Sequence, residues 1–201
     1  MKINQQQIVL ASNNQGKIRE INQLLSKLEC NVLALKTFTN EEAIEDGLSF
    51  VENAIKKARF ACKASGLPAI ADDSGIEVDA LNGQPGIYSA RFAGENASDE
   101  ENVDKLLADL AEFSVEQRSA RFQCVMVYMR HAYDPTPIIC QGTWEGNISC
   151  ERHGENGFGY DPVFYVERDN CTAAQLSAER KNILSHRGQA LAKLMQTLNN
   201  G

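Results

Sequence analysis

The amino-acid sequence predicts an α/β protein with a mixed β-sheet and flanking helices. Short apolar segments of strand character alternate along the chain with segments of helical periodicity. Residues recognised as helix start and stop signals flank several of the helical segments. Strand-like segments follow one another directly around residues 121–150, which indicates antiparallel neighbours in that part of the sheet. No internal repeat, low-complexity tract or linker interrupts the chain, so residues 1–201 are predicted to form a single domain.

The first half of the chain alternates strands and helices. Ser49 and Glu52 have the spacing of a capping box, and Gly66 and Pro68 form a stop signal. One face of the first helix collects the apolar residues Ile18, Ile21, Leu24, Leu25 and Leu28. The predicted elements are a strand at 7–12, a helix at 16–28, a strand at 32–38, a helix at 49–66, and two strands joined by a turn at 69–81.

The second half begins with a helix that Ser98 and Glu101 are expected to cap. The segment "ARFQCVMVYMR" is rich in the aromatic and branched residues that favour strands. The predicted elements are a helix at 98–110, a strand at 120–130, a pair of strands at 137–150, and two closing helices at 172–186 and 188–200.

Composition excludes several classes of protein. The net charge is -7, so no global basic field is present for binding long nucleic acid. No apolar run has the length of a membrane span, and "IVLA" is too short for the core of a signal peptide. Six cysteines are scattered without a Cys-x-x-Cys pair, which argues against a zinc site and a disulfide framework. We therefore expect a cytoplasmic protein with no membrane partner.

Two adjacent aspartates, Asp72 and Asp73, follow the apolar run "LPAIA". Removing a carboxylate from water is costly unless something compensates its charge. One interpretation is a turn, because Asp-Asp-Ser-Gly is good turn chemistry. The other is a metal site. On this stretch alone the turn is the commoner case.

A polar junction joins the first strand to the first helix. Free amide groups and the helix dipole favour an anion at such a place, and Lys17 adds a full positive charge. The alternative is a helix cap with a solvated lysine. A P-loop is excluded because Ala11 and Ile18 stand where that motif requires Gly and Ser or Thr. The residues of the junction are Ser12, Asn13, Asn14, Gln15, Gly16 and Lys17.

Three further segments carry polar or aromatic groups. In "GENGFGYDPVFY", glycines flank Phe158, and an aromatic ring on such a loop is suited to stacking on a base. In "ERKNILSHRGQAL", Ser185 is expected to cap the last helix, near whose positive end His186 and Arg187 would project. The acidic run "NEEAIEDG" could supply a second carboxylate to a metal. Taken alone, each is more often an ordinary loop or a solvated surface.

Together these parts suit a nucleoside triphosphate with magnesium, since Mg²⁺ prefers one or two carboxylates plus phosphate oxygens. The chain resembles the inosine/xanthosine triphosphate pyrophosphatase family, in particular its bacterial members. These enzymes clear deaminated purine nucleotides. The matching motifs are "SNNQGK", "SFVENAIKKA", "IADDSGIEVDAL", "PGIYSARFAG", "GFGYDPVF" and "SHRGQAL". Their order and spacing match over nearly the whole chain.

The resemblance implies an elongated mixed sheet with two lobes around a central active-site cleft, and a homodimer. It implies Mg²⁺-dependent cleavage of a purine nucleoside triphosphate between the α and β phosphates, giving a monophosphate and pyrophosphate. Implied phosphate contacts are the junction at 12–17 and Lys57, and Asp73 is implied as proton acceptor and metal ligand. The remaining implied substrate contacts are Ser74, Phe158, Gly159, Tyr160, Asp161, Lys181, His186 and Arg187.

One position departs from the family pattern. Many members carry a metal-binding Glu three residues before the glycine that corresponds to Gly47, and here that position is Ile44. Glu45 lies next to it and is the candidate for the second metal ligand. Two rival functions remain open: a nucleotide sensor without catalysis, which would not need Asp73, and a pyrophosphatase for modified pyrimidine or methylated nucleotides.

Overall fold

The computed structural model describes residues 7–25 and 31–200. Its strands form one seven-stranded sheet in the order β2-β1-β3-β4-β5-β6-β7. Strand β1 (Gln7–Leu10) pairs in parallel with β2 (Asn31–Ala34) and with β3 (Ala69–Val78), whereas β6 (Phe164–Val166) pairs antiparallel with its neighbours β5 and β7. The predicted α/β class with a mixed sheet and flanking helices is confirmed.

The chain divides into two compact units, and each is described here by itself. Unit 1 comprises Met1–Asp73, Cys124–Gly142 and His186–Gly201, and unit 2 comprises Ser74–Gln123 and Thr143–Ser185. Three long strands contribute residues to both units, namely β3, β4 (Ser119–Met129) and β5 (Ile138–Ile148).

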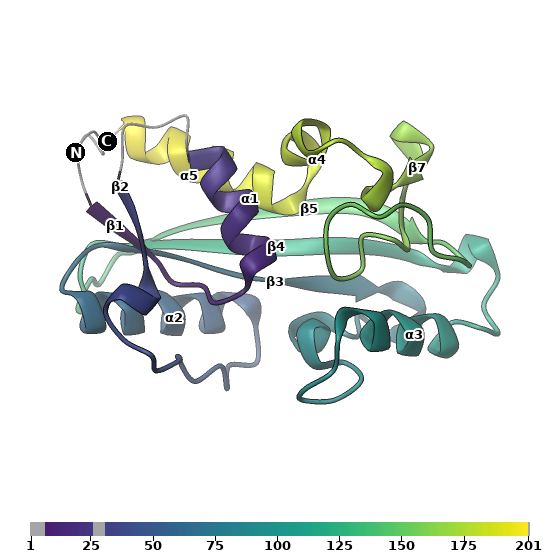
Figure 1. The fold of residues 1–201 in the computed structure, drawn as a ribbon, viewed down its shortest axis with the longest axis horizontal. Helices are drawn as coiled ribbons and strands as arrows, with labels where there is room; N and C mark the ends of the chain where they lie inside the picture. Colours follow the sequence, from purple (N-terminus) through teal and green to yellow (C-terminus); the bar gives the residue numbers. More distant parts are fainter. Residues whose placement is uncertain (1–6, 26–30, 201) are drawn as a thin grey trace. The chain divides into compact units, whose positions relative to one another are not determined.

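Unit 1 is a three-layer arrangement, with helices on both faces of its strands (Figure 1). One buried cluster joins Ile70 of β3 to Ile21 of α1 (Gln15–Leu25) and Leu194 of α5 (His186–Asn200). A second cluster joins Ala71 of β3 to Ala58 of α2 (Phe50–Ser65). Because successive side chains of a strand point to opposite faces, β3 serves both layers at once.

Unit 2 has its own apolar core, in which the Phe164 ring lies 4.6 Å from Phe122 and 5.0 Å from Trp144, measured between ring centroids. Helix α3 (Asp99–Asp109) contributes Leu106 to this core. Helix α4 (Ala178–Leu184) lies on the other side of the strands from α3, and the short strand β7 (Cys171–Thr172) forms the edge of the sheet beside β6 (Figure 1). The core of unit 2 is therefore covered from both sides.

Several predicted helix ends are confirmed. The Ser98 hydroxyl accepts from the backbone N–H of Glu101 and the Glu101 carboxylate accepts from that of Ser98, which is a complete capping box. Ser49 caps α2, and Gly66 ends this helix with a φ of 69°. Residues 26–28, the predicted end of the first helix, lie outside the described residues.

Four predicted elements are wrong in extent. Residues 69–78 form one continuous strand rather than two strands with a turn, and 138–148 also form a single strand. The strand predicted at 32–38 stops at Ala34 and continues as a 3₁₀ turn. The helix predicted at 172–186 is reduced to α4, because β7 and a 3₁₀ turn occupy its first part. At 69–78 and 138–148 the long strands of the sheet override the local turn preference.

Two predictions from composition can be compared with the structure. Among the described residues, no helix is long and apolar enough to cross a membrane. Five cysteines in the described ranges are free thiols, and Cys30 lies outside them. Burial raises the pKa of the Cys124 thiol to about 12, so this side chain behaves as a small apolar group of the unit 1 core.

A glycine sets the distance between β5 and α5. A Cβ atom at Gly142 would lie 2.0 Å from the carbonyl oxygen of His186 and 2.8 Å from the backbone nitrogen of Ala190. We predict that Gly142→Ala lowers the melting temperature by several degrees, because overpacking costs about 1–3 kcal/mol and each kcal/mol shifts it by about 2–4 °C. The neighbouring variant Gln141→Ala is the control, and equal melting curves for the two variants would contradict the proposed close contact.

Candidate functional site

The two aspartates lie within strand β3, and their side chains therefore point to opposite faces of the sheet. Asp72 lies on the same face of the strand as Ile70, and this face packs against α1 and α5. Asp73 lies on the same face as Ala69 and Ala71, and that face packs against α2. The turn interpretation is wrong, and the adjacent like charges are separated by the pleat of the strand.

Asp72 is held by two cations. Its side chain has no exposed surface, and its Oδ2 lies 3.2 Å from Lys17 Nζ of α1 and 3.5 Å from Arg187 Nε of α5. Burial alone would raise the pKa of Asp72, but Lys17, Arg187 and Lys57 together lower it well below the ordinary value. Asp72 is therefore a permanently ionised counter-charge for the groups around it.

Asp73 has a different environment. Its Oδ1 accepts a hydrogen bond of 2.8 Å from Lys57 Nζ, and the same nitrogen donates to Glu45 Oε2 at 3.1 Å. Burial raises the pKa of Asp73, Lys57 and Lys17 oppose this, and the negative charge of Glu45 adds to the rise. A carboxylate with a raised pKa is better suited to accept a proton than one with a lowered pKa.

The acidic run 41–46 contacts cations and amides of unit 1. Glu42 Oε1 accepts from Asn13 Nδ2 at 2.8 Å, and Asp46 pairs with Lys56. Ile44, at the position where the family pattern has a Glu, is 77% exposed, whereas the neighbouring Glu45 reaches Lys57. Of these residues, Glu45 is the carboxylate that shares a partner with Asp73.

The predicted phosphate-binding junction begins α1. Asn14 Oδ1 accepts from the backbone N–H of Lys17 at 3.0 Å, so the side chain of Asn14 caps this helix. Gly16 is buried, and the Gln15 side chain donates to the carbonyl oxygen of Asn13. Asn13 Oδ1 is buried and accepts no hydrogen bond within the described ranges. Such an acceptor is available to a ligand.

The predicted base-binding loop belongs to unit 2, where Asp161 organises it. Its Oδ2 accepts from Lys181 Nζ at 2.5 Å and from the backbone N–H of Phe158 at 2.8 Å. Lys181 Nζ also lies 5.1 Å from the centroid of the Phe158 ring, in a cation–π contact. Gly157 is required here, because a Cβ atom would come within 2.0 Å of Asp161 Oδ2.

The rest of the loop is anchored to the core of unit 2. The Tyr160 hydroxyl donates to the carbonyl oxygen of Ser89 at 2.8 Å, and burial raises the pKa of Tyr160. The backbone N–H of Gly159 donates to Asp99 Oδ2, at the start of α3, at 2.7 Å. The loop is therefore fixed at both of these positions.

The sequence-predicted residues thus fall into two groups. Lys17, Lys57, Asp73, Glu45 and Arg187 belong to unit 1, and the loop with Lys181 belongs to unit 2, as does the half-buried Ser74 of β3. His186 is the buried first residue of α5.

Sequence reasoning missed Glu20, which binds Arg187, and the contact of Glu42 with Asn13. The spacing of Lys17 and Glu20, three positions apart on one helix, could have indicated that their side chains are neighbours.

The described residues contain no group of three or more His, Cys, Asp or Glu side chains that could hold a metal by themselves. Asp73 and Glu45, joined through Lys57, nevertheless provide two carboxylates within reach of one cation. This donor set suits Mg²⁺, which commonly takes one or two protein carboxylates and completes its shell with phosphate oxygens and water.

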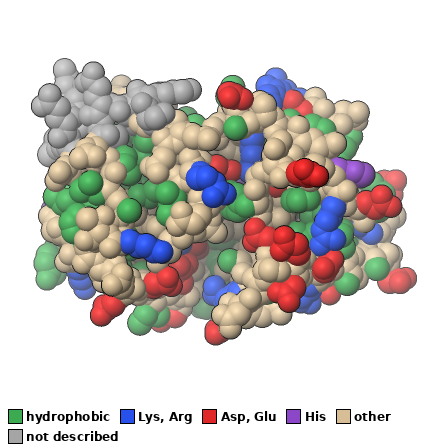
Figure 2. All heavy atoms as spheres, viewed as in Figure 1, with side chains coloured by type: hydrophobic (Ala, Val, Ile, Leu, Met, Phe, Trp, Pro, Cys, Tyr) green, Lys and Arg blue, Asp and Glu red, His purple; other side chains and the backbone are tan. Residues whose placement is uncertain are grey.

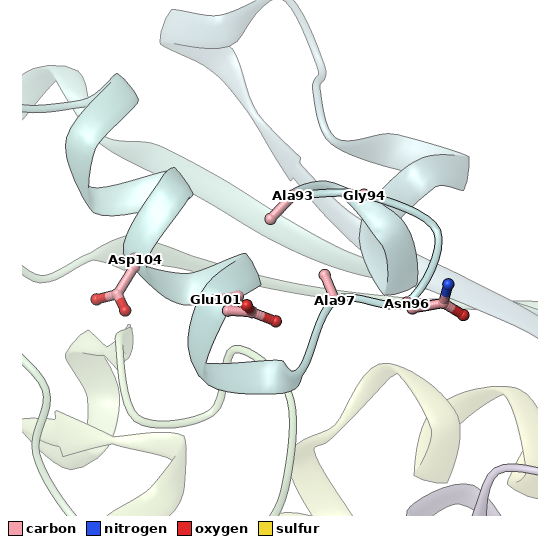
Figure 3. Close-up of a pocket in the computed structure, with 6 residues that line it drawn as sticks. All are labelled: Ala93, Gly94, Asn96, Ala97, Glu101 and Asp104. Carbon is pink, nitrogen blue, oxygen red and sulfur yellow. The ribbon is translucent and has the colours of Figure 1, made fainter.

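Unit 2 contains a pocket of about 430 Å³, and none of the predicted site residues lines it. Two carboxylates of α3, Glu101 and Asp104, and the loop 93–97 before it line the pocket (Figure 3). Acidic side chains also gather on the surface around α3 (Figure 2). Because a triphosphate would be repelled by these charges, the pocket does not suit the phosphate chain.

The contrast between the two aspartates predicts unequal effects on stability. Asp72→Asn should lower the melting temperature strongly, because it removes the completely buried carboxylate that Lys17 and Arg187 share, at a cost of about 3 kcal/mol or more. Asp73→Asn should lower it less, because Glu45 still pairs with Lys57 after the change. Melting curves at pH 7 with a chelator test both. An equal loss in the two variants would contradict the assignment.

Comparison with known proteins agrees with the sequence motifs. The model of the Ham1 family matches residues 8–197. A dITP/XTP pyrophosphatase of Photobacterium profundum is 58% identical over 95% of this chain and 97% of its own length, and one of Vibrio parahaemolyticus is 59% identical over 95% and 96%. The structure of a HAM1 protein from Coxiella burnetii, 48% identical, superposes with a TM-score of 0.90 over 98% of this chain and 100% of that chain. The predicted family resemblance is thereby confirmed, and the chain belongs to the Ham1 family.

Proposed function

We propose that this protein hydrolyses the deaminated purine nucleoside triphosphates ITP, dITP and XTP to the monophosphate and pyrophosphate. The names of relatives that align over nearly their full length support this activity. The observation that carries the proposal is the geometry at Asp73, a buried carboxylate of β3 whose Oδ1 accepts a hydrogen bond from Lys57 Nζ at 2.8 Å and whose pKa is raised by burial. Such a group is expected where a water molecule must lose a proton.

In the proposed reaction, Asp73 accepts a proton from a water molecule whose oxygen attacks the α-phosphorus. The bond from that phosphorus to the oxygen that bridges to the β-phosphorus breaks, and pyrophosphate leaves. Lys17 and Lys57 offset the negative charge that grows on the leaving group. Both lysines are fixed by aspartates of β3, so their ammonium groups are placed before the substrate arrives.

The family resemblance implies that the reaction needs Mg²⁺, and Asp73 and Glu45 are the residues that would hold it. Mg²⁺ supplies charge neutralisation at the phosphates and lowers the pKa of a bound water. In the ligand-free protein, Lys57 is the shared ion-pair partner of both carboxylates. A bound Mg²⁺ would take over this charge compensation, and the ammonium group of Lys57 would then be available to phosphate oxygens.

We assign base binding to the loop of unit 2. Phe158 offers a ring face for stacking, and Lys181 is held against this ring by Asp161. Asp161 is occupied by the loop itself, and so its role in base binding is to hold Lys181 and the backbone at Phe158. We further propose a homodimer in the cytoplasm, which the family resemblance supports, and size-exclusion chromatography with light scattering tests the dimer.

The substrate assignment predicts that purified protein releases pyrophosphate from ITP, dITP and XTP much faster than from ATP or GTP. Asp73→Asn should reduce turnover about a hundredfold or more with the fold retained. Phosphate and pyrophosphate are quantified separately across a panel that includes modified pyrimidine and methylated triphosphates. Release of pyrophosphate mainly from those analogues would favour a related pyrophosphatase, and binding without any release would favour a sensor.

The loop assignment predicts that Asp161→Asn raises KM for ITP about tenfold or more, because Lys181 loses its buried counter-charge and the backbone at Phe158 loses a charged acceptor. Asp169→Asn, which removes the ion pair with Arg180 in the same unit, is the matched control. If both variants lower the melting temperature equally and neither changes KM, Asp161 has only a structural role.

A further inference from the structure

Glu20 connects the buried charges of unit 1. It lies on α1 one turn after Lys17, and its Oε2 forms an ion pair with Nη1 of Arg187. The Arg187 side chain is only 3% exposed and that of Glu20 is 14% exposed, so water screens this pair weakly.

The contacts extend from Glu20 to Lys17. Arg187 Nε lies 3.5 Å from Asp72 Oδ2, and the same oxygen lies 3.2 Å from Lys17 Nζ. The four charges therefore alternate in sign, from Glu20 through Arg187 and Asp72 to Lys17. Since Lys17 and Glu20 lie on the same helix, the series begins and ends on α1 and links it to β3 and α5.

Two cations compete for one oxygen in this series. Arg187 and Lys17 both approach Oδ2 of Asp72, which is completely buried. Glu20 attracts the guanidinium from its other end and balances its charge. Without Glu20, Arg187 would have one carboxylate fewer, would draw Asp72 more strongly and would repel Lys17.

We propose that Glu20 is a positioning residue for the phosphate site, acting on Lys17 through Arg187 and Asp72. It touches no substrate in this role. It forms an ion pair with Arg187, one of the two cations beside Asp72. Lys17 can then stay beside Asp72, in the position in which its ammonium group contacts the phosphate chain. The inference rests on the proposed function only in taking Lys17 as a phosphate contact.

The test measures binding, so that it does not depend on turnover. Titration calorimetry at fixed Mg²⁺ compares inorganic pyrophosphate, which needs Lys17, with inosine monophosphate, which lacks the β and γ phosphates. Glu20→Gln keeps the shape and removes the charge. We expect it to weaken pyrophosphate binding about tenfold, as is usual when a residue that orients a ligand contact is changed, with less than a twofold change for the monophosphate. Arg19→Gln, an exposed neighbour on α1, should change neither.

A double variant separates positioning from general destabilisation. If Glu20 acts through Lys17, Glu20→Gln should have no further effect on pyrophosphate binding in the Lys17→Ala background. Should Glu20→Gln fail to fold, Glu20→Asp keeps the charge with a shorter reach and should weaken pyrophosphate binding to a smaller degree.

Three results for the variants would overturn the inference: additive losses of pyrophosphate affinity in the double variant, equal losses of affinity for both ligands, or no loss in Glu20→Gln. Wild-type protein that does not bind pyrophosphate would also overturn it. The protein could fail to hydrolyse the triphosphates and still show the effect of Glu20→Gln on pyrophosphate binding. That result would count against the proposed function but would support the role of Glu20.

Discussion

The burial of two adjacent carboxylates in one strand is the constraint on which the site in unit 1 depends. Ionised Asp72 and Asp73 could not remain inside the protein side by side without compensation, since each would lose the stabilisation that water gives. The pleat of β3 directs them to opposite faces, and they form their ion pairs with different helices, Asp72 with α1 and α5 and Asp73 with α2. The helices of unit 1 therefore do more than cover the sheet. Each places a lysine or an arginine beside one of the two aspartates.

The number of cations distinguishes the two aspartates. Asp72 faces both Lys17 and Arg187, and its pKa is lowered in spite of complete burial. Asp73 has Lys57 as its direct partner and shares that lysine with Glu45, and its pKa is raised. The two neighbouring aspartates thus differ in pKa because their side chains lie on different faces of the sheet. One is a fixed counter-charge, and the other is suited to exchange a proton and to take part in holding a metal.

The sequence predicted the order of the main elements, the mixed sheet and the caps at Ser49 and Ser98, because these depend on local periodicity and short-range hydrogen bonds. It failed for the segment 69–81, where Asp-Asp-Ser-Gly favours a turn locally. Residues 69–78 of this segment instead form β3, a continuous strand that lies between β1 and β4 in the sheet. Contacts such as that of Glu20 with Arg187, 167 positions apart, leave no local pattern and could not be predicted from one sequence.

The surroundings of Arg187 bear on how such a protein selects its base. A guanidinium held by Glu20 on one side and Asp72 on the other has a fixed orientation and little freedom to follow a ligand. Any N–H group that it offers to a 6-oxo purine is therefore placed in advance, and adenine, with a donor at that position, would meet an unmatched buried donor. Discrimination against adenine would then depend on the same ion pairs that position Lys17. If Arg187 contacts the base, base choice and phosphate binding would be coupled through Asp72, although neither the base nor the phosphates would need to touch it.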